Sequence, residues 1–158
     1  MSIQVGDRLP PLNLQEGTPR KIHNMGTLFT GKKGVIFAVP GAFTPGCSLT
    51  HLPSYITSAD ELKAQGVDLI VCISVNDAFV MSAWGKAQGV NDKILMLADP
   101  DASYTKAIGL EVEAGSLGGM RSKRYSMVIE DGVVTKLNVE PDSFGISCSL
   151  ATHILNNL

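Results

Sequence analysis

The sequence has 158 residues, the usual size of one domain and enough to bury a hydrophobic core. With 44% hydrophobic and 18% charged residues it cannot be a largely disordered chain. A net charge of −2 without a basic block argues against nucleic-acid binding, and the apolar runs are shorter than the ~20 residues that span a bilayer. Residues 1–11 lack a secretory signal pattern, so we expect a single cytoplasmic domain over residues 1–158.

After a proline-punctuated opening, Gly6–Pro11, strands and helices alternate through the middle of the chain. The expected elements are the strand Val35–Val39, helix Pro45–Gln65, strand Val67–Val75, helix Ala78–Gln88, strand Ile94–Ala98 and helix Ala102–Ile108. Thr44 is the expected N-cap of the first helix, and Pro53 is expected to kink it. Parallel strands need a crossover, which the helices supply, so this order favours a parallel α/β core.

The pattern changes in the last third of the chain. Tyr125–Glu130 and Val133–Val139 are expected strands, and Asp131-Gly132 between them is a strong hairpin signal. Ser149–Leu158 has the apolar spacing of an amphipathic helix. A parallel βαβ half followed by a hairpin and a helix predicts a thioredoxin-like α/β fold, with a central mixed sheet flanked by helices.

Three cysteines, Cys47, Cys72 and Cys148, are too few for a disulfide framework and point to reactive or buried thiols. Cys47 falls in the first turn of a helix that leaves the C-terminal end of a buried strand, where ligands bind in open α/β sheets. The helix N-terminus there favours the thiolate, which is the nucleophile. Thr44 can turn its hydroxyl toward the same place, and Pro40 stiffens the loop.

Motifs along nearly the whole chain resemble the peroxiredoxins, specifically the atypical two-cysteine group of peroxiredoxin 5. The most specific is Pro40–Ser48, which holds the pattern Pro-x-x-x-Thr-x-x-Cys. The other matching segments are Thr50–Pro53, Ser74–Val80, Leu97–Pro100, Lys123–Val128 and Leu137–Asp142.

The resemblance implies a peroxidase for hydrogen peroxide and alkyl hydroperoxides, with peroxynitrite a further candidate and no cofactor. Cys47 would be oxidised to a sulfenic acid, assisted by Thr44 and Arg124. The residues expected to hold the substrate are Pro40, Phe43, Thr44, Gly46 and Arg124. The runner-up function is a peroxide sensor, in which Cys47 is oxidised and signals to a partner without efficient turnover.

In the peroxiredoxin 5 group a cysteine matching Cys148 resolves the sulfenic acid to an intramolecular disulfide, which thioredoxin reduces; glutaredoxin and glutathione are alternative reductants. Cys148 lies in a polar segment expected to be accessible and mobile, and the cycle should require local unwinding around Cys47. Cys72 lies in an apolar run and is expected to be buried, which leaves it as the weaker alternative for resolution. The resemblance also makes a homodimer a candidate, and the mitochondrion and peroxisome remain alternative locations.

Several other residues are candidates for functional roles. His51 follows Cys47 by one helical turn, so a Cys–His pair or half a metal site is conceivable, but a hydrogen bond or a surface role is favoured. Arg121 and Lys123 are expected to be solvated edge residues. Gly115–Gly119 is expected to be a flexible loop, and Phe43 the aromatic residue at the pocket entrance.

Overall fold

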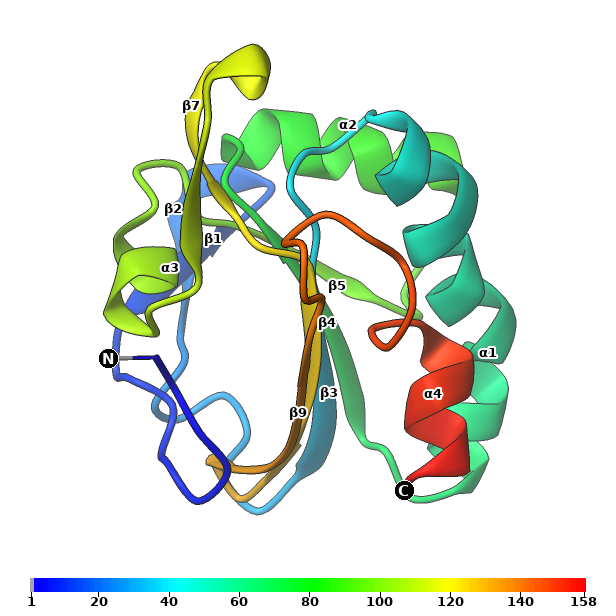
Figure 1. Cartoon of the computed structure of the whole chain (residues 1–158). Coiled ribbons are helices and arrows are strands. Elements are labelled where there is room, and N and C mark those ends of the chain that lie inside the picture. Colours follow the sequence, from blue (N-terminus) through cyan, green and yellow to red (C-terminus); the bar gives the residue numbers. More distant parts are fainter. Residues whose placement is uncertain (1) are drawn as a thin grey trace.

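The computed structural model describes residues 2–158, and a seven-stranded mixed sheet forms its centre, in the order β2-β1-β5-β4-β3-β8-β9 (Figure 1). Its strands are β1 (Asn13–Glu16), β2 (Thr18–Asn24), β3 (Lys33–Ala38), β4 (Leu69–Ser74), β5 (Leu95–Ala98), β8 (Tyr125–Glu130) and β9 (Val133–Val139). β3, β4 and β5 run parallel, while the other neighbours pair antiparallel. The predicted mixed sheet flanked by helices is confirmed.

Helices cover both faces of this sheet (Figure 1). The helices α1 (Leu52–Ala64), α2 (Ala78–Gln88) and α4 (Ala151–Asn156) pack on one face, and α3 (Ser103–Ala107) packs on the other. Side chains alternate along β3, so that Val35 and Phe37 face α1 while Ile36 faces the second core. Burial on both faces explains why the central strands are continuous apolar runs. No helix in residues 2–158 has the length and apolar character needed to cross a membrane.

The predicted hairpin of β8 and β9 is present, and its turn residues Asp131 and Gly132 both have positive φ values, 50° and 79°. This is the backbone geometry that makes Asp-Gly a hairpin signal. The last helix, α4, is shorter than predicted and begins at Ala151, because Leu150 is extended and the preceding residues bond elsewhere.

Two hairpins were not predicted. β1 and β2 pair through a tight turn at Gly17, but β2 is polar and exposed and so lacks an apolar alternation. The expected loop Gly115–Gly119 connects the two strands of a second sheet, in which β6 (Glu111–Ala114) pairs with β7 (Gly119–Ser122) across the 3-10 turn η2 (Gly115–Leu117). The flexibility of this loop stays a prediction, and the hairpin projects beyond the main sheet (Figure 1).

Candidate active site

The segment between β3 and the first helix carries the cysteine motif. The Ala42 N–H donates to Asn76 Oδ1 at 3.0 Å, which ties this loop to the turn after β4. The Thr44 hydroxyl donates to the Gly41 carbonyl at 2.7 Å, while the Thr44 carbonyl accepts the Ser48 N–H at 2.8 Å. Thr44 thus begins the helix through its backbone. The predicted side-chain cap is wrong, because in residues 2–158 no backbone N–H donates to the Thr44 hydroxyl oxygen.

Cys47 opens a single π-helical turn, η1 (Cys47–His51), before α1 begins. The Leu52 N–H bonds the Cys47 carbonyl five residues back, and Pro53 follows without an N–H to offer. The kink predicted at Pro53 stays a prediction; the structure shows instead that the π-turn ends at His51, just before Pro53 in the first turn of α1. Single π-turns are rare and are frequent at functional sites. The Cys47 side chain is fully buried.

Arg124, at the start of β8, lies beside Cys47 as the resemblance implied. Arg124 is 4% exposed, and its Nη2 donates to Cys47 Sγ at 3.3 Å. Nε donates to the Phe144 carbonyl at 3.2 Å and Nη1 to His51 Nδ1 at 2.9 Å. All three nitrogens of the guanidinium therefore have an acceptor, which fixes its position. A fixed cation at this place can stabilise negative charge that develops on a leaving oxygen.

Gly46 allows this close approach. A Cβ at this position would lie 3.2 Å from Arg124 Nη2 and 3.3 Å from Ile146 Cδ1. Gly46 therefore serves the site by leaving room for the arginine, rather than by lining the pocket described below.

His51 is fully buried, and both of its ring nitrogens have partners. Because an arginine can only donate, Nδ1 accepts from Arg124, and Nε2–H donates to the Ser149 carbonyl at 3.1 Å. Burial, and next the Arg124 charge, lowers the pKa of His51 to about 3, so the ring is neutral at ordinary pH. The hydrogen-bonding role is confirmed, and neither a Cys–His pair nor a metal site is formed by these contacts.

Neutral His51 makes the fold sensitive to acid. The unfolded chain binds a proton at His51 below pH 6.5, whereas the folded chain does so only near pH 3. The contribution of neutral His51 to the free energy of unfolding is therefore fully present above pH 6.5. The free energy of unfolding should fall as the pH drops toward 3, by up to roughly 1.4 kcal/mol per pH unit. Urea unfolding between about pH 7.5 and 4.5 measures this slope. His51→Gln should flatten it and the control His153→Gln should not; equal slopes in all three proteins would contradict the assignment.

A pocket of about 420 Å³ opens beside the cysteine motif. Its walls come from the motif, from Arg124 and from the tip of the β6–β7 hairpin: Pro40, Thr44, Glu113, Ala114, Gly115, Ser116, Leu117, Arg124 and Phe144. Phe43 is 56% exposed and lies outside this lining, so its predicted place at the pocket is corrected. The aromatic residue at the pocket is Phe144, which sequence reasoning missed.

Arg121 holds the hairpin wall of this pocket in place. Nη1 donates to the Val75 carbonyl at 2.6 Å, and Nη2 donates to the Leu117 carbonyl at 2.7 Å. The expectation of a solvated edge residue is wrong, because Arg121 joins β7 both to the end of β4 and to the turn η2.

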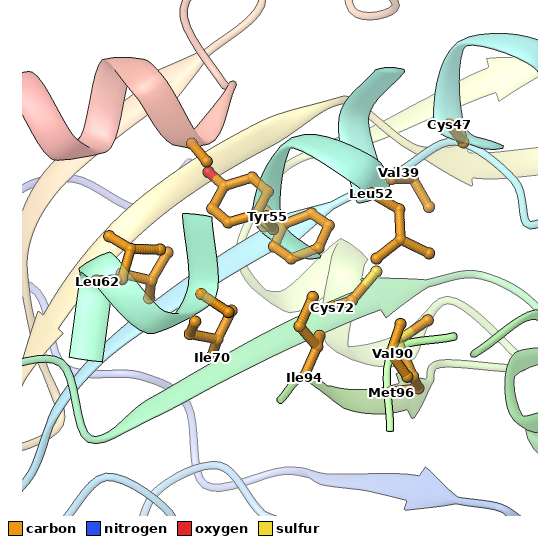
Figure 2. Packing of buried hydrophobic residues seen from close by; sticks show 14 of the residues in the cluster. Val39, Cys47, Leu52, Tyr55, Leu62, Ile70, Cys72, Val90, Ile94 and Met96 are labelled. Carbon is orange, nitrogen blue, oxygen red and sulfur yellow. The ribbon is translucent and has the colours of Figure 1, made fainter. Parts of the chain in front are cut away.

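The other two cysteines differ in their surroundings. Cys72 is fully buried in β4, among the apolar side chains drawn in Figure 2. Burial raises the pKa of its thiol well above the usual value. Cys148 is half-buried, and its Sγ donates to the Val139 carbonyl at 3.6 Å. Its backbone N–H bonds Glu140 Oε2 at 2.9 Å, so the segment that was expected to be mobile is hydrogen-bonded in place. All three cysteines are free thiols.

Comparison with known proteins assigns this site to a class. A family model described as Redoxin matches residues 4–150, and the chain therefore belongs to the Redoxin family. Within that family its relatives are peroxiredoxins. Peroxiredoxin-2E, chloroplastic, from Arabidopsis thaliana is 46% identical over 88% of this chain. The chain spans 62% of the length of that plant protein.

Solved structures agree with the assignment. The crystal structure of reduced Prx3 from Vibrio vulnificus in complex with hydrogen peroxide is 55% identical, with a TM-score of 0.93 over 99% of both chains. Peroxiredoxin 5 from Alvinella pompejana is 42% identical, with a TM-score of 0.83 over 92% of this chain and 95% of its own. The thioredoxin-like fold of these proteins is thus shared by this chain.

Proposed function

We propose that this protein is a peroxidase that reduces hydrogen peroxide and small alkyl hydroperoxides, with peroxynitrite a further candidate substrate. The observation that carries the proposal is the buried Cys47 sulfur, which accepts a hydrogen bond from Arg124 at 3.3 Å. Pro40, Thr44 and Arg124 also line the adjoining pocket. The relative from Vibrio vulnificus, solved with hydrogen peroxide, supports this choice of substrate.

In the first step the Cys47 thiolate attacks the terminal oxygen of the peroxide. The O–O bond breaks, the sulfur is oxidised to sulfenic acid, and the other oxygen leaves as an alcohol or water after taking a proton. In this proposal Arg124 stabilises the negative charge on the leaving oxygen, and the Thr44 hydroxyl, which donates to Gly41, accepts a hydrogen bond from the peroxide O–H.

In the second step the Cys148 thiol attacks the sulfenic sulfur of Cys47, which forms an intramolecular disulfide and releases water. The family implies a thiol reductant, and we propose thioredoxin, with glutaredoxin or glutathione as alternatives. Cys72 is the weaker candidate for resolution, because it is buried in the core. A cytoplasmic location stays a prediction of the sequence.

We also propose a homodimer formed through the face around the cysteine motif. Its support is a set of exposed apolar side chains, Phe43, Leu49 and Phe79, which are 56%, 77% and 61% exposed. The bond between Ala42 and Asn76 brings the loop before the first helix next to the start of α2. Exposed apolar patches on a protein surface commonly mark interfaces with other proteins.

Turnover separates the peroxidase from the sensor that was its alternative. With thioredoxin, thioredoxin reductase and NADPH, the protein should consume peroxide in many catalytic cycles, followed as NADPH oxidation. Oxidation limited to one equivalent of peroxide with every one of the three reductants would reject the enzyme in favour of the sensor.

A further inference from the structure

A buried carboxylate with no role in the steps above lies behind the Cys148 segment, Ser147–Ser149. Glu140 directly follows β9 and is 1% exposed. Its oxygens accept the backbone N–H groups of all three residues of the segment at 2.8 to 2.9 Å. They also accept the hydroxyls of Ser147 and Ser149, both at 2.6 Å.

These hydrogen bonds keep Glu140 ionised. In residues 2–158 no lysine or arginine forms an ion pair with it. Burial acts to raise the pKa of Glu140, but the hydrogen bonds from Ser147 and Ser149 outweigh burial and lower the pKa to about 2. The charge is therefore compensated by the Cys148 segment itself, so a departure of this segment leaves a carboxylate that only water can solvate.

The Cys148 segment is also bonded toward Cys47. The Ser149 carbonyl accepts from Tyr55 at 2.7 Å and from His51 at 3.1 Å. His51 in turn accepts from Arg124, which donates to the Cys47 sulfur. One chain of hydrogen bonds thus runs from the Cys47 sulfur to the residue next to Cys148 and ends on Glu140.

In this arrangement the two thiols meet different groups. The Cys148 sulfur contacts the Val139 carbonyl, whereas the Cys47 sulfur contacts Arg124. A disulfide requires a sulfur–sulfur distance of about 2.05 Å and Cα atoms within about 7 Å. Two sulfurs with these separate partners cannot bond to each other until at least one of them leaves its partner.

We propose that Glu140 is a positioning residue that holds the Cys148 segment in the reduced enzyme, and that release from this carboxylate limits the rate of disulfide formation. The proposal rests on the proposed role of Cys148 in resolution. Burial, and next the charge of Glu140, raises the pKa of the Cys148 thiol, so release would both free and activate the nucleophile. The other titratable groups that face this segment are His51 and Tyr55, which both donate to the Ser149 carbonyl, and Arg124 lies behind them as the partner of His51.

Alkylation of Cys148 tests the holding role without any peroxide. In a Cys47→Ser, Cys72→Ser background, Glu140→Gln removes the charge and turns one acceptor into a donor that faces N–H groups. Iodoacetamide should then modify Cys148 about tenfold faster at the same pH, the effect of losing a single charge-assisted hydrogen bond. Ser147→Ala should give a smaller increase, and the exposed control Glu130→Gln none.

The rate of disulfide formation tests the second part of the proposal, that release of the Cys148 segment from Glu140 is limiting. With all cysteines present, one equivalent of peroxide should give the Cys47–Cys148 disulfide faster in Glu140→Gln than in the wild type, with less sulfinic acid in excess peroxide. An unchanged alkylation rate, or faster alkylation with an unchanged or slower disulfide step, would overturn the proposal. If the wild type forms no such disulfide, the proposed function fails instead, and the alkylation result still reports on the holding role.

Discussion

Replacing Cys47 by serine is expected to lower the rate of peroxide reduction by more than about 10³-fold, to the level of the uncatalysed reaction. The hydroxyl of serine is a far weaker nucleophile than a thiolate, and Arg124 cannot ionise it. Every later step depends on the sulfenic acid at this sulfur. The measurement is the rate of peroxide loss in the thioredoxin-coupled assay.

The matched control is Cys72→Ser. Cys72 is fully buried in β4 and has no part in the proposed cycle, so this variant should keep nearly the full rate. Folding of both variants can be compared by urea unfolding, since a buried serine carries its own cost in stability. If Cys72→Ser were inactive and Cys47→Ser active, the assignment of the reactive sulfur would be reversed.

Arg124→Ala should have the second largest effect. It removes the donor at 3.3 Å from the Cys47 sulfur and the partner of His51. Losing one preorganised donor to a developing negative charge costs about 10²- to 10³-fold in rate, and we expect a loss of that size in the first oxidation step. Single-turnover oxidation, followed by a thiol probe at Cys47, isolates this step from reduction by the partner.

Arg124→Lys separates charge from geometry. A lysine keeps the cation but cannot contact Cys47, His51 and the Phe144 carbonyl together, so it should recover only part of the rate. Full activity in Arg124→Ala would show that the helix start alone activates Cys47.

The sequence predicted the parts of the molecule in which local pattern and tertiary packing agree. β3 and β4 are apolar runs buried on both faces, and Asp131-Gly132 adopts the turn that its residues favour. The β1–β2 and β6–β7 hairpins escaped prediction because their strands are short or polar, so neither shows a hydrophobic period. In such strands backbone pairing decides the structure, and side-chain pattern carries little signal.

The residues of the site also fall into those that the sequence could predict and those that it could not. The motif with Thr44 and Cys47 is contiguous, so its position at a helix start could be predicted from residues alone. Arg124 is 77 residues from Cys47, and only resemblance to a family could place it there. Glu140 and Phe144 had no signal of their own, since their roles arise from contacts made in the folded chain.

The central claim is that Cys47 and Cys148 form a working pair within one chain. Its most direct test is peptide mass mapping under non-reducing conditions after one equivalent of hydrogen peroxide. We predict a single new linkage, between the peptides that contain Cys47 and Cys148, in a product with the mass of one chain. A linkage that uses Cys72, or one that joins two chains, would contradict the account.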